Sequence, residues 1–469
     1  MGATPLIAAT GAEVVAWHRG EPIDAERFLA HAHELATALP DGRHLLNLCA
    51  DRYRFAVTLC AAMLSGRICL LPPNHTPDLL RRLAGMYRDT GVVSDTDGLE
   101  TTLPVLSFPP APSPGTRSRT RGEVPVIDDR QVVAHVFTSG STGLPTAHRK
   151  TWGSLVRNVR AEARRLGVRP GATLVGTVPP QHMYGFESTV LLALQNRIAF
   201  HGGSPFFPAD ILAALAATPG DRVLVTTPYH LRMLLAEPLQ LPPVAMVVSA
   251  TAPLAPALAR EAELRFGAPL VEIYGCTEAG QLATRRPTQG DTWATFDGVR
   301  VSRRESPVPG ATGWYAEGGH IETPTRLSDV LELHGPERFR LLGRDADMVN
   351  VAGKRASIAH LNHLLCAIPG VIDGAFFNPD GGAREVQRLT AFVVTESLTP
   401  RAILAGLRRA TDAVFLPRPL HLVDRLPRAA TGKLPQAALE ELARRCAEQP
   451  ERRGRPARGT GAADGGATR

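Results

Sequence analysis

The chain has 469 residues, of which 44% are hydrophobic, so it is long enough for two or three domains with sizeable cores. Its net charge is +7, but the arginines are spread along the chain without an aromatic-interleaved basic motif, which argues against a nucleic-acid partner. The six cysteines form no C-x-x-C pair and no apolar stretch is long enough to span a bilayer, so we expect a cytoplasmic protein with reduced thiols and no membrane span.

The first part of the chain alternates helical and strand patterns. Apolar spacing predicts helices over 24–38 and 53–65, and short buried strands over 44–49 and 68–71. This alternation is typical of β-α-β units. Residues 107–125 are rich in Pro, Ser and Arg, and we expect them to form a solvated connector.

A run of small hydroxyl residues and glycines interrupts the next strand. It comprises Thr138, Ser139, Gly140, Ser141, Thr142 and Gly143. Glycines allow backbone N–H groups to converge on an anion and hydroxyls add further donors, so the pattern is typical of a phosphate-binding loop. Lys150 downstream could offset the charge of the bound group. The alternative is an ordinary Ser/Gly turn, and the sequence G-x-x-x-x-G-K-[ST] of a Walker A loop is absent.

Strand and helix patterns alternate regularly beyond this loop. We predict strands over 172–178, 222–227, 244–248 and 270–273, and helices over 186–195, 209–217, 229–236 and 254–266. The alternation predicts an α/β fold, with a large N-terminal domain of parallel-rich sheets flanked by helices. Ligands on such sheets bind at the carboxyl ends of the strands, which makes the loops at 181–185, 249–253 and 274–278 the candidate site.

The pattern changes after residue 343. Helices are predicted over 357–368 and 400–414, and strands over 371–378, 388–395 and 419–423. We therefore expect a core domain over 1–343, a small mobile α+β domain over 344–446, and a disordered tail over 447–469.

Three further motifs follow the phosphate-binding loop in order. They are YGCTE at 274–278, the pair GR at 343–344 with GKR at 353–355, and PRAATGK at 427–433. With these motifs the chain resembles the adenylate-forming superfamily of acyl-CoA synthetases, luciferase-like enzymes and peptide-synthetase adenylation domains. The resemblance implies that the protein uses ATP and Mg²⁺ to convert a carboxylic acid into an acyl adenylate, whose acyl group then passes to a thiol.

The resemblance also assigns roles to the nucleotide-binding residues. The loop would hold the β- and γ-phosphates, Tyr274 would stack on the adenine, Thr277 would contact the α-phosphate and Glu278 the Mg²⁺. Gly275 would belong to the same ATP-binding site. The residues alone leave other interpretations open. Tyr274 could be a core aromatic at a strand end, and Glu278 a carboxylate in the first turn of a helix.

Five further positions correspond to the ribose-binding, catalytic and hinge residues of the superfamily. Asp329 and Arg344 would hold the ribose, and Lys433 would be the catalytic lysine that bridges the incoming carboxylate and the α-phosphate. The hinge of the mobile domain falls at Asp345 and Ala346. In isolation Asp329 would more often be a turn or cap residue, and Lys433 a solvated surface lysine.

The sequence departs from the superfamily pattern at three positions. Thr146 stands where a lysine usually follows the phosphate-binding loop, and Lys150 could replace it. Ala346 takes the place of an acidic hinge residue, and Gln436 that of a basic residue. These departures leave open a nucleotide-binding module without catalytic activity.

The expected acid pocket is built from small residues and one histidine. Its residues are His182, Tyr184, Gly185, Ser249, Ala250 and Thr251. His182 could donate to the substrate carboxylate, or it could be a half-buried loop histidine. Small side chains at 185 and 250–252 suit a flat ring. The residues HRKTW at 148–152 resemble the short AMP-ligases of aryl polyene (xanthomonadin-type) pigment pathways, which implies a hydroxylated aromatic acid, such as a hydroxybenzoate, and an acyl carrier protein as acceptor.

The acceptor could also be coenzyme A, in an aryl- or fatty acyl-CoA ligase. The small domain carries a set of arginines that would attract either acidic acceptor: Arg401, Arg408, Arg409, Arg418, Arg425 and Arg428. A solvated basic face is the commoner reason for such a set.

Overall fold

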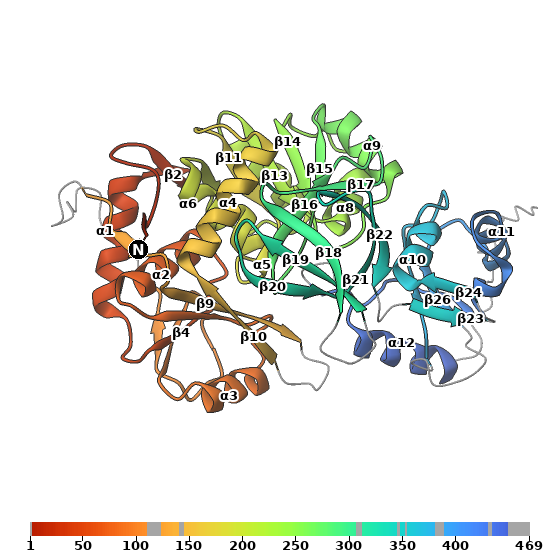
Figure 1. Cartoon of the computed structure of the whole chain (residues 1–469), viewed down its shortest axis with the longest axis horizontal. Helices are drawn as coiled ribbons and strands as arrows, with labels where there is room; N and C mark the ends of the chain where they lie inside the picture. Colours follow the sequence, from red (N-terminus) through yellow and green to blue (C-terminus); the bar gives the residue numbers. More distant parts are fainter. Residues whose placement is uncertain are drawn as a thin grey trace, which may run out of the picture.

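The computed structural model describes residues 2–109, 123–139, 145–305, 312–344, 348–351, 354–379, 389–429 and 434–448. Its elements form two large sheets with helices around them and a separate C-terminal unit (Figure 1). The cysteines are free thiols, and within the described ranges no helix is long and apolar enough to cross a membrane. The central part of the predicted connector, residues 110–122, lies outside these ranges.

A six-stranded sheet carries the phosphate-binding hairpin. Its strand order is β10-β9-β5-β4-β6-β7, and all neighbours are parallel except the hairpin of β9 and β10. The strands are β4 (His44–Asn47), β5 (Ile68–Leu71), β6 (Thr90–Ser94), β7 (Val105–Ser107), β9 (Val132–Ser139) and β10 (Pro145–Thr151). Two of its connections are the helices α2 (Arg52–Leu64) and α3 (Pro77–Met86), while α1 (Ala25–Ala38) packs against α2. The short strands β1 (Ala3–Pro5) and β8 (Val126–Asp128) pair separately.

An eleven-stranded sheet forms the centre of the molecule. Its strand order is β21-β22-β17-β16-β15-β14-β13-β11-β12-β2-β3. The strands from β15 to β2 are parallel, and they are β15 (Leu270–Cys276), β14 (Met246–Ser249), β13 (Arg222–Thr226), β11 (Thr173–Gly176), β12 (Ala199–His201) and β2 (Val14–His18). The antiparallel strand β3 (Glu21–Asp24) ends the sheet on one side.

Helices cover both faces of this sheet. On one face, α7 (Pro208–Ala217), α8 (Pro228–Ala236) and α9 (Pro256–Phe266) share a core with strand residues such as Leu224 and Val247. On the other face, α4 (Trp152–Leu166), the π-helical segment η1 (Phe186–Leu191) and α6 (Leu192–Asn196) pack on Val225 and Val248. The predicted α/β fold is thereby confirmed.

The region between the YGCTE motif at 274–278 and the C-terminal unit is rich in antiparallel strands. It extends the large sheet by β16 (Gly280–Arg285), β17 (Thr292–Thr295), β21 (Asp329–Leu333) and β22 (Arg338–Arg344). A separate three-stranded sheet consists of β18 (Val299–Glu305), β19 (Thr312–Gly318) and β20 (Ile321–Leu327).

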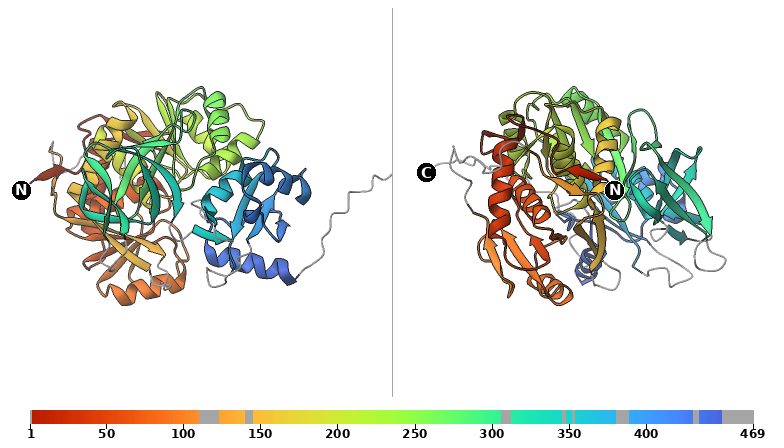
Figure 2. Two further views of the ribbon diagram at one scale, coloured as in Figure 1. Left: turned by 45° about the vertical axis from the view of Figure 1, so that its right-hand side comes forward. Right: turned by 60° about the vertical axis from the view of Figure 1, so that its left-hand side comes forward.

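The C-terminal residues form their own hydrophobic cores and a separate body in Figure 2. Their elements are β23 (Met348–Val351), β24 (Lys354–Ser357), α10 (Ile358–Cys366), β25 (Asp373–Phe377), β26 (Thr390–Val394), α11 (Pro400–Ala410), a 3₁₀ turn at Ala413–Phe415, β27 (Leu420–Leu422) and α12 (Gln436–Glu448). The helix predicted over 400–414 ends early, since Asp412 starts the 3₁₀ turn. The predicted disordered tail begins too early, because residues 447–448 belong to α12; residues 449–469 lie outside the described ranges.

Candidate active site

The tip of the β9–β10 hairpin is the predicted phosphate-binding loop. The two strands pair until Ser139 lies opposite Pro145, so residues 140–144 connect them at the edge of the six-stranded sheet. Gly140, Ser141, Thr142 and Gly143 lie outside the described residues, as does the side chain of Ser139. Thr138 is therefore the loop residue that the structure places with its side chain.

His148 links the base of this loop to Glu278. The Nε2 atom of His148 lies 2.9 Å from Thr138 Oγ1 and 3.8 Å from Glu278 Oε1. Burial lowers the pKa of His148, although the carboxylate of Glu278 opposes this. The side chain of Glu278 is 44% exposed, so it can reach a ligand in front of the loop. No role was predicted for His148, yet it lies on the same strand as Lys150 at a spacing of two, which in a strand means the same face.

Thr277 and Glu278 lie in the turn between β15 and β16, two antiparallel neighbours. The prediction of a loop over 274–278 was therefore wrong at its start, because β15 continues to Cys276. The alternative interpretation of Glu278 as a first-turn helix residue was also wrong, because a strand follows it. Gly275 has no room for a side chain, since an added Cβ would lie 2.5 Å from the carbonyl oxygen of Gly280.

Lys150 contacts the same turn on its buried side. Its side chain is buried, and its Nζ atom donates to the carbonyl oxygen of Glu278 at 3.1 Å. Burial lowers the pKa of Lys150, while Glu187 contributes the largest opposing effect. A direct contact between Lys150 and a phosphate, as predicted, would have to use one of the other two N–H donors of this buried ammonium.

Tyr274 and Asp329 form the ribose end of the candidate site. Tyr274 packs on Trp293 and Phe339, each at a ring-centroid distance of 5.7 Å, and its hydroxyl donates to Asp329 Oδ2 at 2.8 Å. The core interpretation of Tyr274 is thus compatible with a ligand-binding role. Asp329 opens β21 and pairs with Arg344 of β22, so the backbone brings both predicted ribose-binding residues together. The side chain of Arg344 lies outside the described part.

The residues of the expected acid pocket lie at the carboxyl ends of β11 and β14. His182 caps the short helix α5 (Met183–Gly185), and its Nδ1 atom accepts from the backbone N–H of Tyr184 at 3.3 Å. A neutral His182 therefore carries its proton on Nε2 and is a donor there. Tyr184 donates to the carbonyl oxygen of Val248 at 3.1 Å, which ties α5 to β14. Ser249 ends β14 and is fully buried.

Backbone geometry restricts two other residues of this pocket. At Gly185 an added Cβ would lie 2.2 Å from the carbonyl oxygen of Pro179, so only glycine fits without a shift of the chain. Thr251 has a φ of 81°, in the left-handed region that a branched side chain rarely adopts. Ala250, which lies between Ser249 and Thr251, is 6% exposed. Strain of this kind is common where a loop faces a ligand.

Lys433, Asp345 and Ala346 lie outside the described residues. The chain just before Lys433 is anchored by Arg428, which donates from Nε and Nη2 to the carboxylate of Asp373 at 2.6 and 2.7 Å. Asp373 also lies 3.8 Å from Nη2 of Arg232 on α8, so this ion pair joins the C-terminal unit to the larger part of the chain. Sequence reasoning missed Asp373, because no motif includes it.

Mg²⁺ fits the donor set around Glu278. Among the residues that the structure describes, no group of three or more His, Cys, Asp or Glu side chains could hold a metal ion alone. Mg²⁺ in nucleotide sites is usually held by one or two carboxylates and the phosphates of the substrate. Glu278, partly exposed beside the phosphate-binding loop, supplies such a carboxylate.

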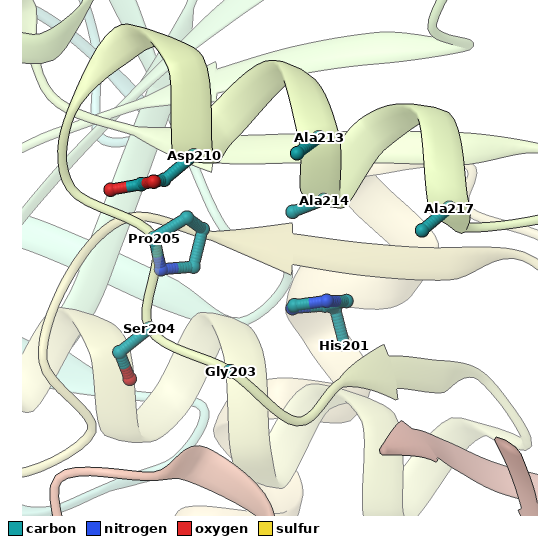
Figure 3. A pocket seen from close by; sticks show the side chains of 8 residues that line it. All are labelled: His201, Gly203, Ser204, Pro205, Asp210, Ala213, Ala214 and Ala217. Carbon is teal, nitrogen blue, oxygen red and sulfur yellow. The ribbon is translucent and has the colours of Figure 1, made fainter. Parts of the chain in front are cut away.

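A surface pocket of about 450 Å³ lies between the chain after β12 and helix α7 (Figure 3). It is lined by His201, Gly203, Ser204, Pro205, Asp210, Ala213, Ala214 and Ala217. None of the predicted ATP- or acid-binding residues lines it, so this pocket is separate from the candidate active site.

Comparison with known proteins agrees with this geometry. Residues 87–303 match the family model of AMP-binding enzymes. A 4-coumarate–CoA ligase of Rhodobacter capsulatus is 32% identical over 279 residues, which cover 59% of this chain and 67% of that protein. A salicylyl-CoA synthase / salicylate adenylyltransferase of a Streptomyces species is 26% identical over 401 residues, covering 77% of this chain and 71% of that protein.

The fold is shared with solved structures. The O-succinylbenzoate coenzyme A synthetase of Bacillus subtilis, in complex with AMP, superposes with a TM-score of 0.77 at 16% identity, covering 94% of this chain and 99% of that one. The match to the family model and the 32% identity to a ligase of which two thirds is covered show that the chain belongs to the adenylate-forming superfamily of AMP-binding enzymes, as an acid–thiol ligase.

Proposed function

We propose that the protein activates an aromatic carboxylic acid, in particular a hydroxylated one, as its acyl adenylate and transfers the acyl group to the thiol of an acyl carrier protein. The observation that carries this proposal is the convergence of three predicted groups. Thr138 at the phosphate-binding loop connects through His148 to Glu278, and Tyr274 in the same hairpin as Glu278 bonds to Asp329. Phosphate, metal and ribose contacts of one nucleotide would thus come from adjacent elements.

The chemistry requires one anion to attack the phosphorus of another, so the protein must mainly neutralise charge and align the reactants. Mg²⁺, when bound, would spread the charge of the phosphates. Glu278 would hold it, Thr277 would contact the α-phosphate, and His182 would donate from Nε2 to the substrate carboxylate. Lys433 would bridge the carboxylate and the α-phosphate when the small domain is docked.

We further propose that residues 1–343 and 344–446 act as two domains, which rotate about Asp345 and Ala346 between adenylation and thiol transfer. The separate cores of the C-terminal unit support this division. The ion pair of Arg232 with Asp373 would form in one arrangement of the domains and open in the other.

An aromatic acid is supported by the small pocket residues and by the relatives. Ala250 presents only a methyl group, whereas Gly185 is small because the Pro179 carbonyl fills the place of a Cβ. The relatives from Rhodobacter and Streptomyces are named for 4-coumarate and salicylate. The test is pyrophosphate exchange with ATP across a panel of aromatic and aliphatic acids. Exchange with hydroxybenzoates supports the proposal, and no exchange with any acid of a broad panel would refute it.

The acceptor is tested separately, with holo-acyl carrier protein and coenzyme A as alternatives. Five of the six arginines expected to attract it are exposed: Arg401, Arg408, Arg409, Arg418 and Arg425. The sixth, Arg428, is paired with Asp373, so its contribution to a free basic surface was predicted wrongly. Replacing Arg408 and Arg409 by Glu should slow transfer to an acidic carrier protein without changing adenylation.

The second candidate is a nucleotide-binding module without catalysis, which Thr146 in place of the usual lysine favours. Lys433→Ala distinguishes the two functions. A catalyst should lose adenylation and keep most of its ATP affinity, whereas a binding module would have no activity to lose.

A further inference from the structure

Two buried side chains donate hydrogen bonds to backbone carbonyls of the turn that carries Thr277 and Glu278. Lys150 Nζ donates to the carbonyl oxygen of Glu278 at 3.1 Å, and His320 Nε2 donates to that of Ala279 at 2.9 Å. Burial lowers the pKa of His320 to about 4, so this imidazole is neutral and its proton lies on the donating Nε2. Each carbonyl of the turn is therefore fixed by a side chain of another element.

The next residue of the hairpin lies directly on the same buried polar groups. Gly280 has a φ of 81°, and an added Cβ would lie 2.9 Å from Asn158 Nδ2, 3.1 Å from Glu187 Oε1 and 3.2 Å from His320 Nε2. Asn158 in turn donates to Glu187. The hairpin thus packs on a polar floor formed by Asn158, Glu187 and His320, with no space between them for a larger residue.

Lys150 is placed to act on this turn and not on the phosphate-binding loop. Thr146, His148 and Lys150 alternate along β10 and share one face of the strand. Four residues of extended strand separate Thr146 from Lys150 by roughly 13 Å, which moves the ammonium away from the loop tip. His148 and Lys150 instead meet the same residue, one near the carboxylate of Glu278 and the other at its carbonyl oxygen.

An apolar side chain in the buried site of Lys150 would avoid the desolvation free energy that an ammonium costs. A buried ammonium needs both a counter-charge and hydrogen-bond acceptors, because its desolvation costs several kcal/mol. The Glu278 carbonyl is its acceptor, and Glu187 is the acid whose charge would favour the ammonium most, although burial also raises the pKa of Glu187, to about 8. The arrangement fixes a specific backbone position, a task that an apolar residue would not perform.

We propose that Lys150 is a positioning residue: its hydrogen bond to the carbonyl oxygen holds the backbone of Glu278 so that the carboxylate faces the phosphate-binding loop. This inference rests on the proposed function, because it assigns the metal contact to Glu278. It replaces the expectation that Lys150 itself binds phosphate.

The test compares Lys150→Met with Arg149→Met, a matched loss of one positive charge at an exposed residue of the same strand. ATP affinity is measured by calorimetry with and without Mg²⁺, and adenylation is measured as a function of Mg²⁺. Lys150→Met should lose most of the increase in ATP affinity that Mg²⁺ confers and should need roughly tenfold more Mg²⁺ for half-maximal adenylation. Its Mg²⁺-free ATP affinity should stay within about twofold of the wild type, as should every value for Arg149→Met.

Loss of a buried charge can also unfold the protein, so a second variant separates positioning from stability. Lys150→Met/Glu187→Gln also replaces the buried acid by a neutral amide, so no carboxylate can be left buried without the ammonium at any pH. This variant should recover much of the melting temperature that Lys150→Met loses. If the Mg²⁺ dependence stays shifted in this variant, positioning is supported. A wild-type Mg²⁺ dependence in either Lys150 variant would overturn the inference. Failure of the proposed function looks different, because the wild type would then adenylate no acid while its Mg²⁺-dependent ATP affinity could still be compared.

Discussion

Glu162 provides a direct test of the buried polar groups under the active site. It lies on α4, is fully buried, and interacts with Ser188 and Gln281. Burial raises the pKa of Glu162 from 4.5 to about 7, and the hydrogen bonds with its two neighbours only partly oppose this. Glu162→Gln keeps the shape of the side chain and removes its titration.

The sign of the effect follows from proton binding. The folded protein keeps the Glu162 proton up to a pH of about 7, whereas the unfolded chain loses it near pH 4.5. The free energy of unfolding contributed by this group is therefore present below pH 4.5 and is lost as the pH rises to about 7. At about 1.4 kcal/mol per pH unit, the loss amounts to about 3 kcal/mol above that range.

Glu162→Gln avoids this loss, so it should be more stable than the wild type at about pH 8 by up to about 3 kcal/mol and similar to it near the lower end of the range. Urea unfolding monitored by tryptophan fluorescence measures the difference, because the four tryptophans, Trp17, Trp152, Trp293 and Trp314, all precede the C-terminal unit. Glu261→Gln, at an exposed site on α9, is the matched control. A stability difference between Glu162→Gln and wild type that is constant with pH would refute the reasoning.

Three further changes test other parts of the structure. Tyr274→Phe removes the donor to the Asp329 carboxylate and should weaken ATP binding roughly tenfold in a titration, with an unchanged KM for the acid; equal ATP affinity would contradict the assigned ribose contact. Gly185→Ala places a methyl group against the Pro179 carbonyl. We expect this overpacking to lower the free energy of unfolding by about 1–3 kcal/mol, seen as a lower melting temperature, together with loss of adenylation. Burial raises the pKa of the Cys60 thiol, so iodoacetamide should modify it in urea but not in the native protein, as mass spectrometry of the peptides can show.

The sequence predicted the parallel strands well and the antiparallel region poorly. The strand over 68–71 agrees with β5 (Ile68–Leu71) at both ends, because four buried apolar residues bounded by Arg67 and Pro72 leave little choice. β18 (Val299–Glu305) was not predicted, since four of its seven residues are arginine or glutamate on exposed positions. The helix over 186–195 begins as the π-helical segment Phe186–Leu191, because six residues are too few to distinguish helix types by their apolar spacing.

Motifs predicted the residues that would contact the nucleotide, whereas only the structure shows the buried residues that support them. Tyr274 and Glu278 belong to a contiguous motif, so their type and spacing could be recognised in the sequence. Lys150 and Glu278 are 128 positions apart, and their contact depends on how two hairpins from different sheets meet. Glu187 is similarly hidden, because a single glutamate in an apolar helical pattern gives no sign of its partner.

The position of the site at a junction of two sheets explains why its support is polar. β10 belongs to the six-stranded sheet and the β15–β16 hairpin to the eleven-stranded one, so no strand pairing fixes one against the other. Buried cations bridge the two instead. Besides Lys150, the fully buried Arg52 at the start of α2 donates from Nη2 to the carbonyl oxygens of Gly176 at 3.0 Å and Val178 at 2.9 Å, at the end of β11.

Hydrogen bonds from a cation to a carbonyl have a fixed length and direction, whereas apolar contacts between sheets tolerate sliding. Substitutions at these bridging residues should therefore disturb the alignment of the phosphate-binding loop with Glu278 more than they disturb either sheet. A variant of this kind would keep its secondary structure and lose adenylation, which separates alignment between the sheets from the stability of each.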